Sequence, residues 1–379
     1  MRFSKKAVRI LIVFCLTFTV SPVLGAEDQH SFVAGLRLRE SGLSIDIINL
    51  PKCTVSKSLP VDRNATHLVL KDKDTVFLPF RGNFERGYHQ ILELSLNSKK
   101  TQLWATPLSA GPGKIMTEKN AYWVCFDHII KPKNQLEKSR ENGLSNYQES
   151  GFELYSKEIP AKLINVLRLG EFHHIFEWCW DKKKTKIYLA SSPFATRDTK
   201  TESRQFFKHC PSYLQVIDIQ KQKITLDQDI SEYIEDISGF YLQDEKFYIC
   251  GIRDPKKKDL DMPKSANRYL QIFDEKTFNH CRSIKIDFLP TKIVGAPMEH
   301  RLFILHRSLM KNNKTSITVI NTLTDQLVSK LEFSGIQKIA CTKGFLFVMV
   351  PENLIIIDAT TLKTVKKLPG TYTFISEES

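Results

Sequence analysis

The stretch NLIIIDATTLKTVKKL, residues Asn353–Leu368, contains the repeating unit of this chain. Its apolar run Leu354–Ile357 is typical of a buried strand, and the polar residues Asp358–Thr361 predict a turn before a second strand. The same pattern recurs at Ser316–Leu331 and, more loosely, at Leu214–Leu226. A strand, a polar turn and a return strand that recur along a chain indicate a repeat architecture.

Seven copies of this pattern follow one another along the chain. In each copy a short polar residue begins the turn, because such side chains can accept hydrogen bonds from nearby backbone. The copies are Leu43–Leu59, Gln90–Trp104, Phe152–Leu167, Leu214–Leu226, Leu270–Ile286, Ser316–Leu331 and Leu354–Leu368. The residues that begin the turns are Asn49, Ser95, Ser156, Asp218, Asp274, Asn321 and Asp358.

Six further pairs of β-rich runs lie between these copies and predict inner strands. They span His67–Phe80, Lys114–Phe126, Phe172–Ala190, Ser238–Ile252, Lys292–His306 and Ile336–Val350. Six inner pairs and seven outer pairs leave one blade incomplete. Ser31–Arg39 can supply its second strand and Thr371–Ile375 its innermost one, and this pairing of the chain ends would close the ring and remove open sheet edges.

The sequence therefore predicts an all-β fold, a seven-bladed β-propeller with four strands in each blade. A six-bladed ring, with the N-terminal strands packed elsewhere, is the alternative. Three stretches, VIDIQKQKI, VINTLTDQLVSKL and IIIDATTLKTVKKL, resemble the repeat of the YVTN / quinoprotein amine dehydrogenase-like β-propeller family. The resemblance covers most of the chain as a periodic pattern and implies the propeller fold. Because that family has many roles, it implies no particular activity.

The first residues predict a secretory signal peptide over residues 1–25. A basic segment, Arg2–Arg9, precedes the apolar run Ile10–Val20, and small residues follow up to Gly25. An uncleaved anchor is the alternative, although this apolar run is shorter than the roughly 20 residues of a membrane-spanning helix. We expect residues 26–379 to form a single propeller domain that is exported, periplasmic or extracellular, with no transmembrane segment after cleavage.

Seven cysteines follow the predicted signal peptide. Their number is odd and there is no CxxC pair, so buried free thiols that pack as small hydrophobic groups are expected. One or two bridges between neighbouring strands are the alternative, since export permits disulfides. The cysteines are Cys53, Cys125, Cys179, Cys210, Cys250, Cys281 and Cys341.

The connections between the second and third strands carry most of the chain's net positive charge. They contain 18 basic and 10 acidic residues, and the net charge without the leader is +9, against +13 with it. In a propeller these connections emerge on one face, where a rigid scaffold can position binding residues. A cationic face attracts anionic partners, although loops are also simply where charge is solvated. The connections are Arg81–Tyr88, Asp127–Ser150, Ser191–Ser212, Arg253–Asn267 and Arg307–Lys314.

Several second strands end in a basic group or an imidazole, and several first strands begin with one. If these side chains meet at the channel mouth they can bind a carboxylate, sulfate or phosphate. The alternative is that strand ends merely favour polar residues. The candidate ligand-binding residues are Arg81, Lys114, His128, His174, Arg253, Lys256, Lys257, Lys258, His306 and Arg307, with Lys292 also facing the channel.

Other chemistry has weak support in the sequence. His173 and His174 are the main concentration of possible metal ligands, but neighbours on a strand point to opposite sides, so no metal is expected. No GxSxG, SxxK or CxxC motif occurs, and no cofactor is expected. The tryptophans are expected to fill the interfaces between blades, with carbohydrate stacking by Trp180 as an alternative; they are Trp104, Trp123, Trp178 and Trp180.

These observations favour an exported, non-catalytic binding or scaffold propeller that contacts an anionic partner or ligand through a basic loop face. The expected partner is a protein or an anionic ligand. Nucleic acid is not expected, because few aromatic residues accompany the basic ones. A monomer is expected. The alternative is an enzyme with its active site at the pore mouth, a lactonase, lyase or quinoprotein-like oxidoreductase, for which His128, His174 and His306 are the candidate bases. A chiefly structural subunit is a third possibility.

Overall fold

A computed structural model describes the unit that begins at Phe32. The described residues are 32–40, 42–61, 65, 67–72, 74–80, 90–105, 109–118, 121–129, 149–158, 161–171, 173–181, 183–193, 212–253, 269–287, 289–307 and 314–378. The predicted signal peptide, residues 1–25, lies outside them. Within these ranges no helix has the length and apolar character needed to cross a membrane.

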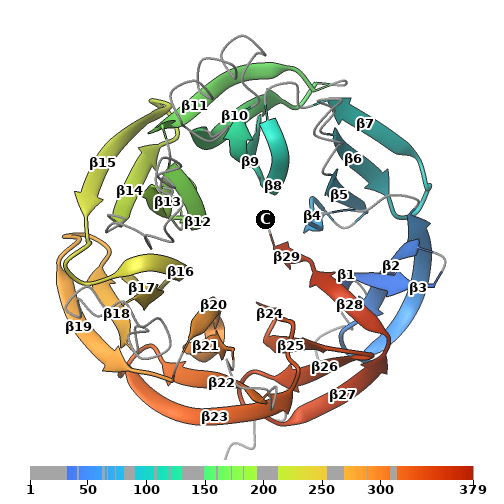
Figure 1. Ribbon diagram of the computed structural model, residues 1–379. Helices are drawn as coiled ribbons and strands as arrows, with labels where there is room; N and C mark the ends of the chain where they lie inside the picture. Colours follow the sequence, from blue (N-terminus) through green and yellow to red (C-terminus); the bar gives the residue numbers. More distant parts are fainter. Residues whose placement is uncertain are drawn as a thin grey trace, which may run out of the picture. The chain divides into compact units, whose positions relative to one another are not determined.

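The described strands form seven sheets, each built on four antiparallel strands, which are arranged as the blades of a propeller around a central axis that we call the channel (Figure 1). Blade 1 consists, from the channel outward, of β28 (Thr371–Ile375), β1 (Phe32–Arg39), β2 (Gly42–Asn49) and β3 (Thr54–Val61). The seven-bladed prediction is therefore confirmed, and the six-bladed alternative is excluded.

Blades 2 to 7 each run outward from the channel in sequence order. Blade 2 is β4 (Val69–Leu70), β5 (Thr75–Phe80), β6 (Gln90–Ser95) and β7 (Thr101–Ala105). Blade 3 is β8 (Ser109–Thr117), β9 (Ala121–Ile129), β10 (Glu149–Ser156) and β11 (Leu163–Glu171). Blade 4 is β12 (His173–Trp180), β13 (Lys186–Pro193), β14 (Tyr213–Asp218) and β15 (Lys223–Asp229).

The last three blades follow the same plan. Blade 5 is β16 (Glu235–Gln243), β17 (Lys246–Arg253), β18 (Tyr269–Asp274) and β19 (His280–Lys285). Blade 6 is β20 (Pro290–Ala296), β21 (Arg301–His306), β22 (Lys314–Asn321) and β23 (Gln326–Ser334), with the 3₁₀ turn η1 (Pro297–Glu299) between its first two strands. Blade 7 is β24 (Lys338–Thr342), β25 (Phe345–Val350), β26 (Asn353–Asp358) and β27 (Thr364–Pro369).

The two ends of the described chain close the ring, as the sequence predicts. β28 pairs antiparallel with β1, from Leu38 opposite Thr371 to Gly35 opposite Ile375. The chain then continues into β29 (Glu377–Glu378), which pairs in parallel with β4 on the channel side of blade 2 (Figure 1). This second pairing, which the sequence did not predict, joins blade 1 to blade 2.

The predicted turn residues act as the sequence suggests. Each ends the third strand of its blade, and its side-chain oxygen accepts a hydrogen bond from a backbone N–H two to six residues ahead. Backbone donors at these turns hold the pKa values of Asp218, Asp274 and Asp358 below the usual range. The local chemistry of the turn therefore sets the end of every third strand.

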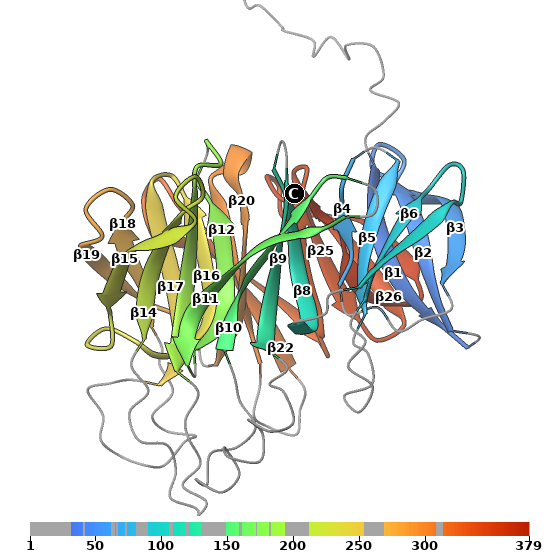
Figure 2. The ribbon, with the colours of Figure 1, turned by 90° about the horizontal axis from the view of Figure 1, so that it is seen from above.

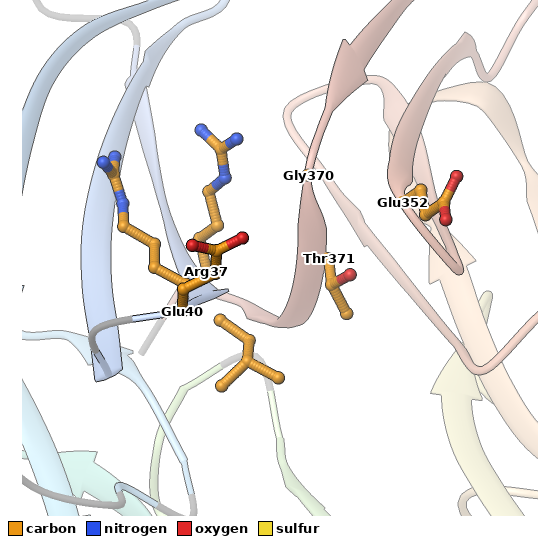
Figure 3. A pocket seen from close by; sticks show the side chains of 7 residues that line it. Arg37, Glu40, Glu352, Gly370 and Thr371 are labelled. Carbon is orange, nitrogen blue, oxygen red and sulfur yellow. The ribbon is translucent and has the colours of Figure 1, made fainter.

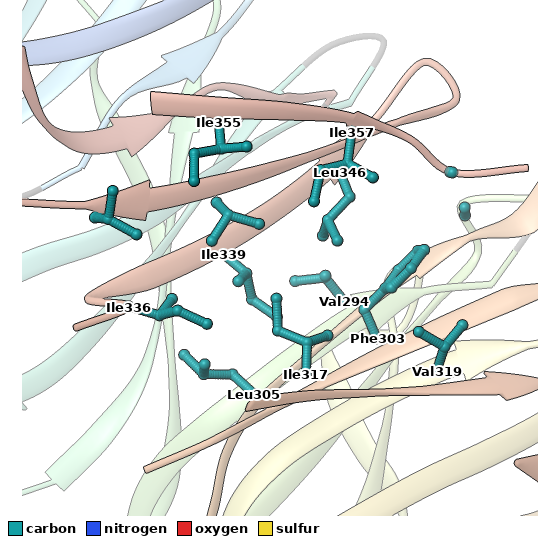
Figure 4. Packing of buried hydrophobic residues seen from close by; sticks show 14 residues of the cluster. Val294, Phe303, Leu305, Ile317, Val319, Ile336, Ile339, Leu346, Ile355 and Ile357 are labelled. Atoms are coloured by element: carbon teal, nitrogen blue, oxygen red, sulfur yellow. The ribbon is translucent and has the colours of Figure 1, made fainter. Parts of the chain in front are cut away.

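The hydrophobic core consists of seven clusters, one at each interface between neighbouring blades. Alternation along a strand explains this arrangement, because successive side chains point to opposite faces of a sheet. In β25, Leu346 and Val348 pack against blade 6, whereas Phe347 and Met349 pack toward blade 1. Figure 4 shows the interface of blades 6 and 7, where aliphatic side chains from both sheets interdigitate.

The tryptophan prediction is confirmed where side chains are described. Trp123 and Trp178 belong to the cluster between blades 3 and 4, and Trp180 packs against it. The cysteines in the described ranges are all free thiols, which excludes a bridge among them. Not all of them are buried, since Cys281 is exposed. Cys250 is buried, and this burial raises the pKa of its thiol to about 12.

A buried carboxylate ties the closing blade together. Asp46 in β2 is fully buried, and it accepts hydrogen bonds from the hydroxyls of Tyr372 at 2.8 Å and Ser58 at 2.5 Å. The guanidinium groups of Arg37 and Arg39 each lie 3.4 Å from it. The five residues come from all four strands of blade 1, so Asp46 links the first and last described segments of the chain.

Replacing Asp46 with alanine should destabilise the fold by about 3 kcal/mol or more, because both guanidinium groups lose their buried counter-charge. Tyr372→Phe removes only one hydrogen bond to a charged group and should cost about 1.5–3 kcal/mol. Urea unfolding followed by circular dichroism measures both effects. The exposed Asp227→Ala serves as control, and a midpoint for Asp46→Ala equal to that of the control would contradict the role assigned to Asp46.

Candidate functional site

The strands of every blade run between two faces of the ring (Figure 2). We call the face where second strands end the loop face, and the face where first strands end the turn face. His306, at the end of β21, therefore lies at the loop face, and η1 lies at the turn face. The backbone of Arg307, which follows β21, lies at the same face.

Much of the predicted site lies outside the described side chains. The backbones of Lys114, His128, His174 and Arg253 are placed in β8, β9, β12 and β17, but their side chains are not described. Arg81 and Lys256, Lys257 and Lys258 lie outside the described residues altogether. Whether these groups meet at the channel mouth therefore stays a prediction.

The segment around Lys114 differs from the prediction. The sequence predicts that Lys114 starts the first strand of its blade. Instead β8 begins at Ser109 and includes Gly111–Gly113, with a shift of register between Pro112 and Ile115. A local irregularity within the strand accommodates the Gly-Pro-Gly sequence, so Lys114 lies within β8 and not at its start.

Lys292 forms an ion pair with Glu177. Lys292 lies in β20 of blade 6 and Glu177 in β12 of blade 4, so the pair connects two first strands that are separated by the first strand of blade 5. Lys292 thus lies at the channel wall, as predicted, but its charge is compensated within the protein.

His306 is nearly inaccessible, with 2% of its surface exposed. It lies near Asp287, which accepts hydrogen bonds from Ser316 at 3.2 Å and Lys330 at 2.8 Å. Burial raises the pKa of Asp287, but the bond to Lys330 and the nearby charges of Lys330 and His306 hold it below the usual value. His306 is therefore shielded from a ligand in the channel, and its charge helps to hold the pKa of Asp287 down.

Arg307 and Lys338 form a pair of neighbouring cations at the loop face. Arg307 is exposed, and its backbone N–H donates to the carbonyl of Leu289 at 3.0 Å, which holds it beside the start of β20. The ammonium of Lys338, the first residue of β24, lies 3.5 Å from the ring centre of Phe374. Burial of this ammonium lowers the pKa of Lys338, and the charge of Arg307 lowers it further.

An open pocket of about 740 Å³ lies on the same face, where blades 7 and 1 meet (Figure 3). Arg37, Arg39 and Glu40 line it from blade 1, and Glu352 and Gly370 from blade 7. A side chain at position 370 would overlap the guanidinium of Arg37, and Gly370 also has φ +122°, so glycine is needed there. The pocket contains as many exposed carboxylates as arginines.

The basic side chains described above differ in whether an acidic side chain neutralises their charge. Arg37 and Arg39 have Asp46, Lys292 has Glu177, and Lys330 has Asp287. Among the described residues, by contrast, neither Arg307 nor Lys338 forms an ion pair. Two adjacent cations without an acid are electrostatically unfavourable in isolation, and an anion placed between them would remove the repulsion. This pair is therefore the best described candidate for an anion site.

The sequence pointed to Arg307 but missed Lys338. Lys338 occupies the start of a first strand, the position that singled out Lys292, so its place in the repeat was a usable signal. Arg37 and Arg39 were also missed, although their spacing places both side chains on one side of β1. No group of side chains suited to hold a metal ion occurs in the described part of the chain.

No model of a known protein family and no curated protein sequence matches this chain. Solved structures that resemble it are β-propeller proteins. Dihydro-heme d1 dehydrogenase NirN in complex with DHE superimposes with a TM-score of 0.57 at 12% identity, over 92% of this chain and 75% of that chain. A putative 6-phosphogluconolactonase from Bacteroides fragilis gives a TM-score of 0.58 at 10% identity, covering 93% and 99%.

Hydrazine synthase from Kuenenia stuttgartiensis gives a TM-score of 0.58 at 8% identity, over 90% of this chain and 99% of that chain. At such low identities these similarities show the propeller fold alone. They agree with the resemblance to propeller repeats found in the sequence, without identifying the YVTN family. Enzymes and proteins of unknown function occur together among the similar structures, which leaves the activity to be argued from the site.

The proximity of Arg307 and Lys338 can be measured by titration. Because Arg307 lowers the pKa of Lys338, Arg307→Ala should raise it. Reductive methylation with ¹³C-formaldehyde and NMR titration of the Lys338 methyl signal, assigned by Lys338→Met, measures this shift. Arg282→Ala, an exposed arginine on the outer strand β19, is the control. An unchanged Lys338 pKa in Arg307→Ala would show that the two charges do not interact.

Proposed function

We propose that this protein is a non-catalytic binding module that takes an anionic ligand at the loop face between blades 6 and 7. The observation that supports this function is the adjacent pair Arg307 and Lys338, which has no acidic partner among the described residues. The basic excess of the second-to-third strand connections, which lie mostly outside the described residues, would extend the same surface. We further propose that the protein is exported, from its N-terminal basic and apolar segments.

The pair suits an oxyanion for two physical reasons. Arg307 offers a planar group that can donate two parallel hydrogen bonds to a carboxylate or phosphate. Lys338 offers a compact charge that the ring of Phe374 holds in place, with its ammonium 3.5 Å from the ring centre. An anion bound here favours the charged form of Lys338, so affinity should fall as the pH rises through the pKa of Lys338.

The enzyme alternative has less support. A catalytic base must come within hydrogen-bond distance of the group it deprotonates, and His306 is almost fully buried. His128 and His174 remain the candidates from the sequence. A binding role needs no base, and the uncompensated cations are sufficient for it.

The double variant Arg307→Ala/Lys338→Met should bind small anions at least tenfold more weakly than the wild type, because both cations of the site are lost. Isothermal titration with citrate and with inorganic phosphate at low ionic strength measures the affinity. The double variant Arg282→Ala/Lys363→Met loses the same charge from the outer strand of blade 5 and the turn face of blade 7. If both double variants bind the anions equally weakly, the loss of affinity comes from net charge alone, and this would contradict the proposed site.

Variants of Lys256–Lys258 test whether the basic connections contribute to the same binding surface. Replacing all three with glutamine should shorten retention on a sulfonate resin, because the loop face loses three charges. The matched control replaces Lys363, Lys366 and Lys367 of blade 7, which are exposed away from the loop face. If both triple variants elute at the same salt concentration, the connections have no special role in binding.

A further inference from the structure

A second group of lysines gathers on the turn face, opposite the site proposed above. Lys71 follows β4 in blade 2, Lys157 follows β10 in blade 3, and Lys184 lies between β12 and β13 in blade 4. The ammonium groups of Lys71 and Lys157 lie 5.5 and 5.4 Å from the ring centre of Tyr122. They are therefore within about 11 Å of each other, on either side of one blade interface.

The positive charges of the three lysines also interact with one another. Burial lowers the pKa of Lys157, and the charges of Lys71 and Lys184 lower it further, while Glu118 acts in the opposite direction. Lys71 forms an ion pair with Glu93 at 2.6 Å. Lys157 forms no ion pair with any residue that the structure describes. Three neighbouring blades thus bring their lysines close enough for the charges to affect one another.

An aromatic side chain borders this group. Trp180 ends β12 and is partly exposed, and the ammonium of Lys184 lies 5.7 Å from its ring centre. The buried side of Trp180 packs edge-to-face on Trp178, with ring centres 6.5 Å apart. Exposed Lys183 and Lys186 continue the positive surface along the same turn. A partly exposed indole beside several ammonium groups can stack on a ring while the lysines bind anionic substituents.

We propose that this turn-face surface binds an acidic polysaccharide, with Trp180 against a sugar ring and Lys71, Lys157 and Lys184 on its carboxylate or sulfate groups. Lysines suit such a polymer because they are flexible point charges that follow a chain of repeated anions, whereas recognition of one fixed oxyanion favours arginine. Single-stranded nucleic acid fits less well, because it needs several aromatic platforms for successive bases. The surface is independent of Arg307 and Lys338, which lie on the other face.

Binding to heparin and to polygalacturonate tests this proposal, with an oligothymidine as comparison. Lys157→Met/Lys184→Met should weaken polysaccharide binding at least tenfold in 50 mM NaCl and reduce the slope of log affinity against log salt by about one for each lysine lost. Lys52→Met/Lys363→Met removes two exposed lysines from the same face in blades 1 and 7, and should bind like the wild type. Isothermal titration of the full chain provides the affinities.

A separate variant tests the role of Trp180 in the proposed polysaccharide site. Trp180→Leu should weaken polysaccharide binding severalfold and leave the salt slope unchanged, with a thermal melt to confirm that the blade interface remains intact. The proposal is overturned if the wild type binds neither polysaccharide, or if both lysine double variants weaken binding equally. Tighter binding of the oligothymidine than of both polysaccharides would also overturn it in favour of nucleic acid.

Discussion

The rest of the structure depends on the contacts that close blade 1. A propeller is a ring of sheets that pack only on their neighbours, so a single open joint would expose two hydrophobic faces to water. Here the joint is made by β28 on β1, by the buried carboxylate of Asp46, which holds Tyr372, and by Ser376, whose backbone N–H donates to Ala34 at 2.8 Å. The additional pairing of β29 with β4 extends the closure into blade 2.

A closed ring fixes which side chains share a face, and this explains where function is to be sought. The interfaces between blades are filled by aliphatic and aromatic groups. Arg307 and Lys338 on the loop face, and Lys157 on the turn face, each interact with another cation and form no ion pair with a described residue. Uncompensated charge on a rigid scaffold is costly without a ligand and favourable with one, so the two faces are the places where anionic partners would act.

Much of the fold could be predicted because its determinants are local. A polar side chain such as Asp358 ends a strand by hydrogen-bonding its own turn, and alternation along a strand such as β25 shows which residues are buried. Counting strand pairs also predicted the closure by Thr371–Ile375. The parallel pairing of β29 could not be predicted, because two residues carry no periodic signal. The start of β8 was predicted wrongly at Lys114, because tertiary pairing extends the strand through Gly-Pro-Gly, whose local preference is a turn.

The candidate site was less predictable, because it depends on contacts between distant residues. The repeat placed Arg307 and Lys292 near the channel, but nothing local shows that Glu177 neutralises Lys292 or that Lys338 has no acidic partner among the described residues. The convergence of Lys71, Lys157 and Lys184 likewise requires three blades to be packed. Whether a charged side chain lies beside an acid or beside another cation can be seen only in the folded structure.

Amide hydrogen exchange measured by NMR or mass spectrometry tests whether the pairing of β28 with β1 closes the ring. If it does, the amides of β28 and β1 should be as protected as those of β25 and β26 and should exchange only when the whole ring unfolds. Much faster exchange in β28 than in β25 would contradict it. The ring would then open between blades 7 and 1 in the native state, and neither face would be held in the arrangement described.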